Sequence, residues 1–246
     1  MQAGKTSDND EPERTAYRIH GHARIRRAVA ACTGAQRLQR RRGRHNPRQT
    51  GGTRTEAARK RRENRGPGTR TSDPATRKLR DPAFVSAMEE LRPDLGIVIA
   101  FRMLPEVVWA MPRLGTFNLH ASLLPQYRGA APINWAIING ESVTGVTTMQ
   151  MDEGLDTGDM IQKTEVEITP DETGESLHDK LAAAGAALCV ETLKAVETHT
   201  ATFEKQGESP TAYARMLDKK LGNIDWSRSA VEIERLVRGL NSWPSA

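Results

Sequence analysis

Cysteine, aromatic residues and long apolar runs are all scarce in this sequence. Its 246 residues include two cysteines, Cys32 and Cys189, which are too few for a disulfide framework and fit a reducing cytoplasm. Neither cysteine lies in a CxxC pair or near a histidine partner, so we expect no zinc site. No apolar run approaches the roughly 18 residues of a membrane span, and no signal peptide is recognisable. We therefore expect a cytoplasmic protein that has no membrane partner.

Apolar residues are especially scarce in the first eighty residues, where arginine dominates. Residues 1–80 hold 22 Lys and Arg against 7 Asp and Glu, a net charge of +15, and 19 of the 22 are Arg. The remaining 166 residues hold 14 against 24, a net charge of −10. A segment so poor in Leu, Ile, Val and Phe cannot bury enough apolar surface to offset its ordering entropy. We expect residues 1–76 to be disordered.

Three interpretations of this arginine-rich segment stay open. It could be a basic arm that binds nucleic acid through its phosphates. It could be a transit peptide, although such peptides are poor in acids and this one has four acidic residues between Asp8 and Glu13. It could also be the out-of-frame translation of a GC-rich gene, since ordinary patterning begins abruptly between Arg77 and Pro82. We favour the third interpretation because it explains the arginine excess and the abrupt change together.

From residue 79 onward the pattern predicts alternating helices and strands. Asp81 and Pro82 are typical of a helix start, and the continuous apolar run at 94–101 predicts a buried central strand. A short helix and a second strand, ending at His120, follow. This order predicts an open α/β sheet, in which ligands bind beyond the carboxyl ends of the strands. The site should therefore lie near residues 101–104 and 118–125.

Asn118 and His120 are the first candidate site residues. Side chains alternate along a strand, so both point to one face while Leu119 points to the other. An amide beside an imidazole can hold and protonate a carbonyl oxygen. The alternative is that the two residues only pair with the backbone of the following loop.

The acidic loop DEGLDTGD at 152–159 supplies a third candidate. Such an acidic loop suggests a calcium site. However, the spacing does not fit a calcium-binding loop and no glutamate stands at its last position, so we expect no metal. One carboxylate could instead turn inward to orient His120 and stabilise its charge. Asp156 is the best placed. The strand before this loop puts Thr147 and Met149 on one face.

These motifs together resemble a known family. Asn118 and His120, the following SLLP and the DxGxDTGD loop around Asp156 are similar to the active-site signature of the folate-dependent formyltransferases. Within that family, HASLLPQYRGAAPINWAI and MDEGLDTGDM most resemble the branch that formylates methionyl-tRNA. The resemblance covers 79–246.

The resemblance implies a fold, a reaction and a set of contacts. The fold would be an open, mainly parallel, Rossmann-like sheet. The co-substrate would be 10-formyltetrahydrofolate, without a metal, and the acceptor would be initiator methionyl-tRNA. Asn118, His120 and Asp156 would be catalytic. The folate would be carried by a loop of four residues: Ser122, Leu123, Leu124 and Pro125.

The resemblance also implies a division into domains, and the sequence departs from the family's pattern at both ends. Residues 77–200 would be the C-terminal part of the catalytic domain. Residues 201–246 would be the linker and the truncated start of a C-terminal β-barrel domain that binds tRNA. The composition of the stretch from Thr198 to Thr211, with Gly, Ser and Pro, indicates where this linker lies. The family's first βαβ unit has no counterpart in 1–76, so the strand at 94–101 would lose a neighbour. We therefore expect the chain to be poorly folded or inactive. Separately, we expect it to be a monomer. The alternatives are a formyltransferase acting on a nucleotide-linked amino sugar, or an inactive fragment or basic RNA-binding protein.

Overall fold

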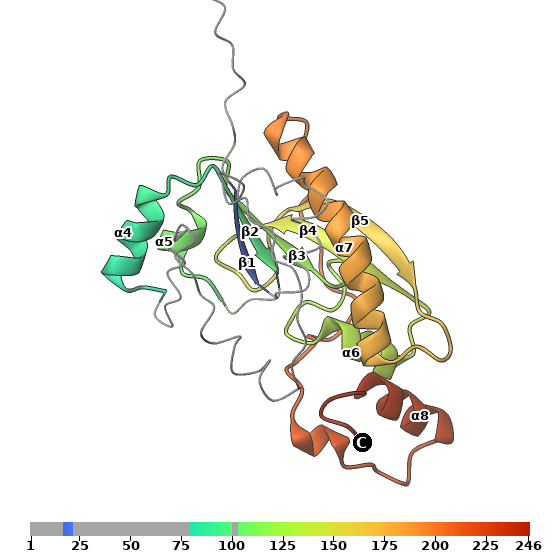
Figure 1. Cartoon of the computed structure of the whole chain (residues 1–246). Coiled ribbons are helices and arrows are strands. Elements are labelled where there is room, and N and C mark those ends of the chain that lie inside the picture. Colours follow the sequence, from blue (N-terminus) through green and yellow to red (C-terminus); the bar gives the residue numbers. More distant parts are fainter. Residues whose placement is uncertain (1–16, 22–78, 100–102) are drawn as a thin grey trace, which may run out of the picture.

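The sheet at the centre of the molecule has five strands in the order β1-β2-β3-β4-β5. The computed structural model describes residues 17–21, 79–99 and 103–246 (Figure 1). The strands are β1 (Tyr17–Gly21), β2 (Leu95–Ile99), β3 (Thr116–His120), β4 (Val143–Gln150) and β5 (Met160–Glu167). The helices are α4 (Pro82–Glu90), α5 (Glu106–Trp109), α6 (Pro132–Asn139), α7 (Gly174–Glu197), the 3-10 helix η1 (Lys219–Gly222) and α8 (Ala230–Gly239).

The sheet is open and mixed. Strands β1, β2 and β3 are parallel, and β4 and β5 continue the sheet antiparallel. The predicted open α/β architecture is therefore confirmed. The pairing register places Val98, Asn118 and Met149 side by side across β2, β3 and β4. Because these three share a row, they present their side chains to the same face of the sheet.

Strand β1 corrects one expectation. It lies inside the segment predicted to be disordered, and all five of its residues pair with β2, from Tyr17 opposite Leu95 to Gly21 opposite Ile99. The prediction that β2 has lost its neighbour is therefore wrong. A composition averaged over eighty residues hides one short YRIHG stretch, in which apolar and polar residues alternate. The rest of the segment 1–76 lies outside the described residues, and its interpretation stays a prediction.

Helices α4 and α6 carry typical residues at their ends, and the start of α4 at Asp81 and Pro82 is the one predicted above. The carboxylate of Asp81 accepts a hydrogen bond from the backbone N–H of Ala83 at 3.0 Å, and Pro82 occupies the first turn of α4. Pro132 likewise opens α6, and Gly140 ends it at a φ of 79°. Glycine adopts this left-handed backbone conformation without steric cost, because it has no Cβ.

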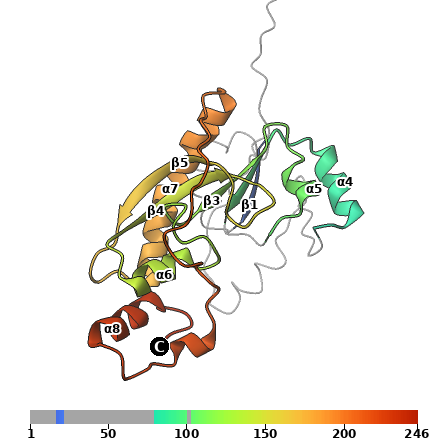
Figure 2. The same cartoon turned by 180° about the vertical axis from the view of Figure 1, so that it is seen from behind.

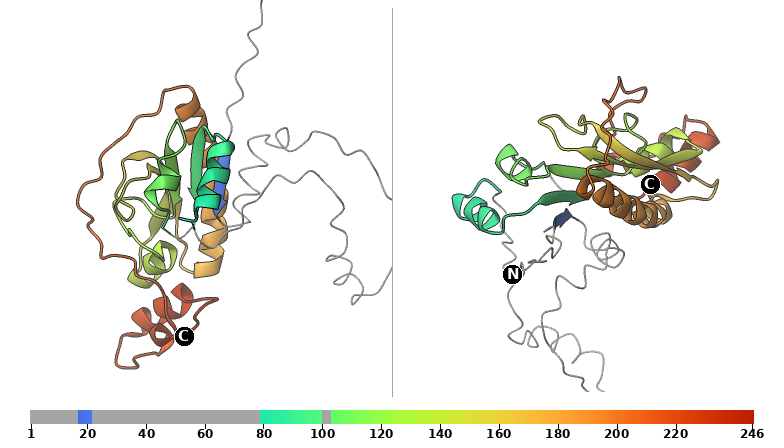
Figure 3. Two further views of the ribbon diagram at one scale, coloured as in Figure 1. Left: turned by 90° about the vertical axis from the view of Figure 1, so that its left-hand side faces the viewer. Right: turned by 90° about the horizontal axis from the view of Figure 1, so that it is seen from above.

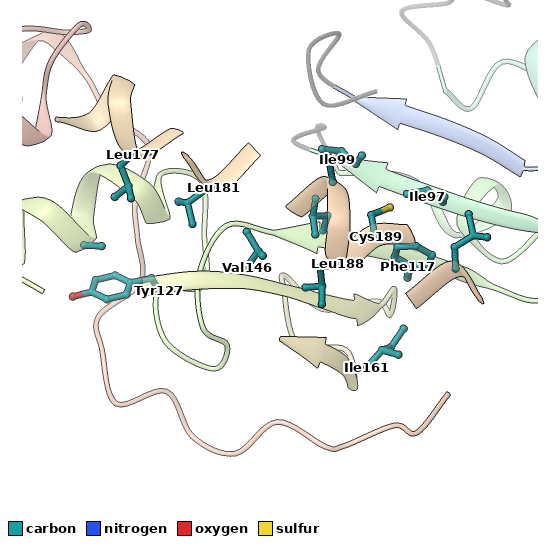
Figure 4. Close-up of a cluster of buried hydrophobic side chains, with 14 of the residues drawn as sticks. Ile97, Ile99, Phe117, Tyr127, Val146, Ile161, Leu177, Leu181, Leu188 and Cys189 are labelled. Atoms are coloured by element: carbon teal, nitrogen blue, oxygen red, sulfur yellow. The ribbon is translucent and has the colours of Figure 1, made fainter. Parts of the chain in front are cut away.

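Helix α7 covers one face of the sheet (Figures 1 and 3). The close-up in Figure 4 shows strand residues such as Ile97, Phe117 and Val146 meeting Leu188 and Cys189 of this helix. Each of these residues is at most 3 % exposed to solvent. This cluster is the main core, and it takes the strand residues that alternate with Asn118 and His120.

The opposite face of the sheet meets a smaller apolar cluster. Val98 of β2 packs there with Phe84 and Met88 of α4, with Val108 of α5 and with Leu104. Since Asn118 lies beside Val98 in the register, its side chain emerges on this second face. The fold thus separates a packed face under α7 from a face that is left open for a site.

The C-terminal residues pack at one end of the molecule, where α8 lies against α6 (Figure 2). The Asn134 amide donates to the carbonyl of Gly239 at 2.7 Å, and Arg238 donates to the carbonyl of Glu172 at 2.7 Å. Residues 216–246, all of which are described, contain η1 and α8 and no strand. The predicted β-barrel therefore stays a prediction. Of the helices in the described ranges, none is long and apolar enough to cross a membrane.

Candidate functional site

Strand β3 carries two of the three candidate residues to the open face of the sheet. Asn118 and His120 lie two residues apart on this strand, and Met149 and Thr147 of β4 pair with them. Asn118 lines a cavity, and His120 contacts Asp156, which lines the same cavity. The structure therefore brings the three predicted side chains together at the end of β3.

His120 is held between two oxygen atoms. Its ring is 6 % exposed. Nε2 lies 3.0 Å from the carbonyl oxygen of Tyr127, and Nδ1 lies 3.8 Å from Oδ2 of Asp156. A carbonyl can only accept, so Nε2 must carry a proton and donate it. The separation on the Nδ1 side is within ion-pair reach but too long for a hydrogen bond. Nε2 is therefore committed to the Tyr127 carbonyl, while Nδ1 faces the Asp156 carboxylate.

Asp156 is held in place by its own backbone and by a neighbouring loop. Its φ is 56°, a left-handed conformation that is uncommon outside glycine and that aspartate adopts more often than most residues. Its Oδ2 accepts a hydrogen bond from the backbone N–H of Gly129 at 2.9 Å. Gly129 has a φ of 128°, and a Cβ there would lie 2.5 Å from the carbonyl oxygen of Ala214. The glycine is thus required for the close approach that positions the carboxylate.

The rest of the acidic loop is bonded to itself. The Asp152 carboxylate accepts hydrogen bonds from the Thr157 hydroxyl at 2.9 and 3.0 Å and from the Gly154 N–H at 3.0 Å. A Cβ on Gly158 would lie 1.7 Å from the carbonyl oxygen of Gln150. Within the described part of the chain, no group of three His, Cys, Asp or Glu side chains could hold a metal ion.

The cavity beside Asn118 and Asp156 has a volume of about 860 Å³. It lies beyond the carboxyl ends of β2 and β3, the edge at which the sequence predicts a ligand. Its wall includes apolar side chains and one side of the acidic loop. The described residues that line it are 79–82, Val98, 103–106, Trp109, Asn118, Met149 and 151–156.

The loop from Ser122 to Pro125 is not part of this wall. None of its four residues is among the described residues that line the cavity. Ser122 and Leu124 are buried, and the Leu123 side chain packs against Gly145 of β4. The hydroxyl of Thr147 ties the loop to β4, because it donates to the Ser122 carbonyl at 2.7 Å and accepts from the Leu124 N–H at 3.1 Å. The folate contacts predicted for this loop stay a prediction.

Tyr127 supplies the carbonyl that holds His120, and its phenol is fixed at the other end. The phenol donates to Oε1 of Glu141 at 2.5 Å and accepts from the Asn139 amide at 3.2 Å. Burial, with the Glu141 hydrogen bond as the next cause, raises the pKa of Tyr127 from 10.0 to about 12. The ring therefore stays neutral in the folded protein well above the pH at which it ionises in the unfolded chain.

This shift predicts a loss of stability at high pH. The contribution is fully present below pH 10, and it disappears as the pH rises through about 12, because the unfolded chain ionises first. By pH 11 the free energy of unfolding should fall by about 1.4 kcal/mol through this one group. Denaturant titrations at pH 8 and pH 11 check it, with Tyr127→Phe as the reference that has no phenol. Equal losses in the two proteins would contradict the prediction.

Several residues that shape the site were missed by the sequence reasoning. The sequence does place Thr147 and Met149 on one face of a strand, and that face is the one at the site. It gives no sign that the Tyr127 carbonyl or the Gly129 N–H would contact the candidate residues. Nor does it indicate that the Gln206 side chain donates to the Asp156 carbonyl, at 3.0 Å. These contacts join segments far apart in the chain, which periodicity cannot detect.

Comparison with known families gives two matches. The sequence pattern described as Formyl transferase matches residues 27–193, and the pattern described as Formyl transferase, C-terminal domain, matches residues 216–246. The first match begins inside the segment 1–76.

Two curated relatives illustrate the similarity. The methionyl-tRNA formyltransferase of Agathobacter rectalis is 56% identical over 170 residues, which are 69% of this chain and 55% of that protein. The methionyl-tRNA formyltransferase of Clostridioides difficile is 54% identical over the same shares. The chain thus spans about 55% of the length of these relatives.

Solved structures agree on the fold. HypX from Aquifex aeolicus, solved in complex with tetrahydrofolic acid, is 25% identical with a TM-score of 0.57, covering 65% of this chain and 28% of that one. A sugar N-formyltransferase from a Shewanella species is 15% identical with a TM-score of 0.67, covering 94% of this chain and 91% of that one, and this likeness bears on the fold alone. The Formyl transferase pattern spans residues 27–193, which is well over half of the chain. This chain therefore belongs to the formyltransferase family.

Proposed function

We propose that this protein transfers a formyl group from 10-formyltetrahydrofolate to the α-amine of methionyl-tRNA. The observation that carries the proposal is its 56% identity, over 170 residues, to a protein named methionyl-tRNA formyltransferase. The grouping of Asn118, His120 and Asp156 beside one cavity supports it, because these are the side chains that the reaction needs.

The cavity is the place where the folate would bind. It is large enough for a flat heterocycle, and ligand sites of this kind combine apolar walls with a few polar groups. Leu104 and Met149 supply apolar surface, and the acidic loop at 152–156 supplies polar groups at the edge. HypX, a structural relative, was solved with tetrahydrofolic acid. We place the folate against these lining residues. The loop from Ser122 to Pro125 does not line the cavity, so it could contact a folate bound there only from outside the wall.

In the reaction the amine nitrogen attacks the formyl carbon, and negative charge collects on the formyl oxygen. The Asn118 amide, which lines the cavity, would donate a hydrogen bond to that oxygen. A donor of this kind stabilises the transition state by roughly 3–4 kcal/mol. When the bond from the formyl carbon to the folate nitrogen breaks, the oxygen returns to a carbonyl and the folate nitrogen takes up a proton.

His120 and Asp156 would receive the proton that the amine loses. Because Nε2 of His120 is committed to the Tyr127 carbonyl, the proton would arrive at Nδ1, on the side of Asp156. The 3.8 Å between Nδ1 and Oδ2 suits a charge pair once the imidazole is protonated. Asp156 would then stabilise the positive ring, and a water molecule could relay the proton.

A direct transfer assay tests the proposal. The chain is incubated with 10-formyltetrahydrofolate and methionyl-tRNA, and formylated methionyl-tRNA is separated from the unformylated form. A nucleotide-linked amino sugar is offered in parallel as the rival acceptor. We expect formylation of methionyl-tRNA that depends on the folate and is lost in Asn118→Ala.

Three results would overturn it. Formylation of the amino sugar alone would identify the sister activity instead. Transfer to neither acceptor by a chain that unfolds cooperatively would leave the fold without the activity. RNA binding that is lost when the arginine run at 37–44 is replaced by serines, in a chain that keeps β1 and shows no transfer, would favour the basic RNA-binding interpretation.

A further inference from the structure

Both oxygen atoms that hold His120 belong to residues with unusual backbones. Tyr127 has a φ of 53° and Asp156 a φ of 56°, and both conformations are left-handed. A bulky residue such as Tyr127 occupies this region at a cost, and a short polar residue such as Asp156 does so at a smaller one. A costly backbone conformation persists only when the surrounding structure fixes it. The position of the imidazole therefore depends on whatever holds these two residues.

One short segment holds both of them. We call residues 204–214 the strap, because they run from β5 to the loop after Tyr127. At its start, Glu204 and Met160 exchange two backbone hydrogen bonds of 2.8 and 2.9 Å. At its end, Ala214 donates to the Arg128 carbonyl at 2.8 Å and accepts from the N–H groups of Ala130 and Ala131. Both ends of the strap are thus fixed to the catalytic part of the chain.

Gln206 is the contact between the strap and the acidic loop. Its amide nitrogen donates to the carbonyl of Asp156 at 3.0 Å and to the carbonyl of Gly158 at 2.7 Å. Its amide oxygen accepts from Nε of Arg128 at 2.9 Å, which fixes the orientation of the amide. The two donors therefore clamp the peptide segment that sets the position of the Asp156 carboxylate.

Thr211 is the contact between the strap and Tyr127. Its hydroxyl accepts the backbone N–H of Tyr127 at 2.7 Å. The carbonyl of the same tyrosine takes the Nε2 proton of His120. A shift of Tyr127 would therefore move the acceptor that fixes the imidazole ring and its protonated nitrogen.

We propose that Gln206 and Thr211 of the strap are positioning residues, which set His120 for catalysis by holding Asp156 on one side of its ring and Tyr127 on the other. Neither touches the reacting atoms. The strap leads directly into residues 216–246, which match the C-terminal domain of the family. The inference rests on the proposed function only for its effect on turnover, since the effect on the imidazole can be observed without a reaction.

The test uses four variants of the whole chain. Gln206→Ala removes both donors, and Gln206→Glu keeps the size and the acceptor for Arg128 but removes the donors. Thr211→Val removes the hydroxyl at nearly constant volume, and Thr211→Ser keeps it. Lys205→Ala, at an exposed position between the strap contacts, is the matched control.

Two readouts decide the question. In transfer assays we expect Q206A, Q206E and T211V to lower kcat between about tenfold and a hundredfold, with the KM for the folate changed less than about twofold, because misplaced groups slow the chemical step. T211S and K205A should keep a kcat close to that of the parent. In ¹⁵N spectra of the histidine rings, we expect the His120 signals to move in Q206A and T211V. The His120 signals are assigned by their absence in His120→Asn.

The outcomes separate the inference from the proposed function. His120 signals in Q206A and T211V that match those of K205A would overturn the inference, as would equal losses of kcat in T211V and T211S. If no variant and not even the parent transfers a formyl group, the proposed function fails. The ring spectra then still decide whether the strap positions His120.

Discussion

Replacing His120 with asparagine lowers kcat for formyl transfer at least a hundredfold. General acid–base groups contribute roughly a hundredfold to ten-thousandfold, and His120 is the group that would take the proton from the attacking amine. Asparagine places an amide near the position of Nδ1, but an amide cannot accept and hold a proton there. The loss should therefore fall on kcat, while binding of the folate in the cavity changes little.

His178 provides a matched control for this substitution. It also lies close to an aspartate, with Nδ1 3.2 Å from Oδ1 of Asp179, but it sits on α7, away from the cavity. His178→Asn should leave kcat unchanged. Transfer assays under single-turnover conditions separate the chemical step from binding. If His120→Asn lowers kcat only a few-fold, His120 does not take part in the chemical step. Its contact with Asp156 would then serve only to stabilise the fold.

Much of the fold follows from local patterns in the sequence. The buried run that became β2, the start of α4 at Asp81 and Pro82, and the end of α6 at Gly140 are each determined by residues within a few positions. The cavity beside Asn118 lies at the strand ends, where the sequence predicts a ligand, because parallel strands gather those ends at one edge. Alternation along β3 then brings Asn118 and His120 to the same face.

What could not be predicted depends on contacts between distant segments. Gln206 reaches Asp156 across 50 positions of the chain, and Thr211 reaches Tyr127 across 84. No local pattern carries such a pairing, so the sequence showed only a linker there. Strand β1 was missed for a different reason. Its five residues are too short a signal against an arginine-rich background, and its pairing with β2 is a property of the sheet.

Replacing Thr147 with valine should lower the free energy of unfolding by about 2–5 kcal/mol. Thr147 is fully buried, and its hydroxyl satisfies two backbone groups at once, the carbonyl of Ser122 and the N–H of Leu124. Valine has nearly the same shape, so packing is kept while both groups lose their partner in the protein interior. Each unsatisfied buried group costs roughly 1–3 kcal/mol. Thermal and denaturant unfolding measure the loss.

The neighbouring Thr148→Val is the matched control, because it removes a buried hydroxyl with one long backbone contact instead of two shorter ones. The Thr148 hydroxyl donates to the Gln162 carbonyl at 3.3 Å and contacts the hydroxyl of Thr192, which keeps a second hydrogen bond to Oε1 of Gln162 at 2.8 Å. This variant should therefore cost only about 1 kcal/mol. Equal losses in the two variants would mean that the loop from Ser122 to Leu124 does not depend on the hydroxyl. The expected difference instead makes Thr147, which pairs with His120 in the sheet, the residue that fixes this loop beside the site.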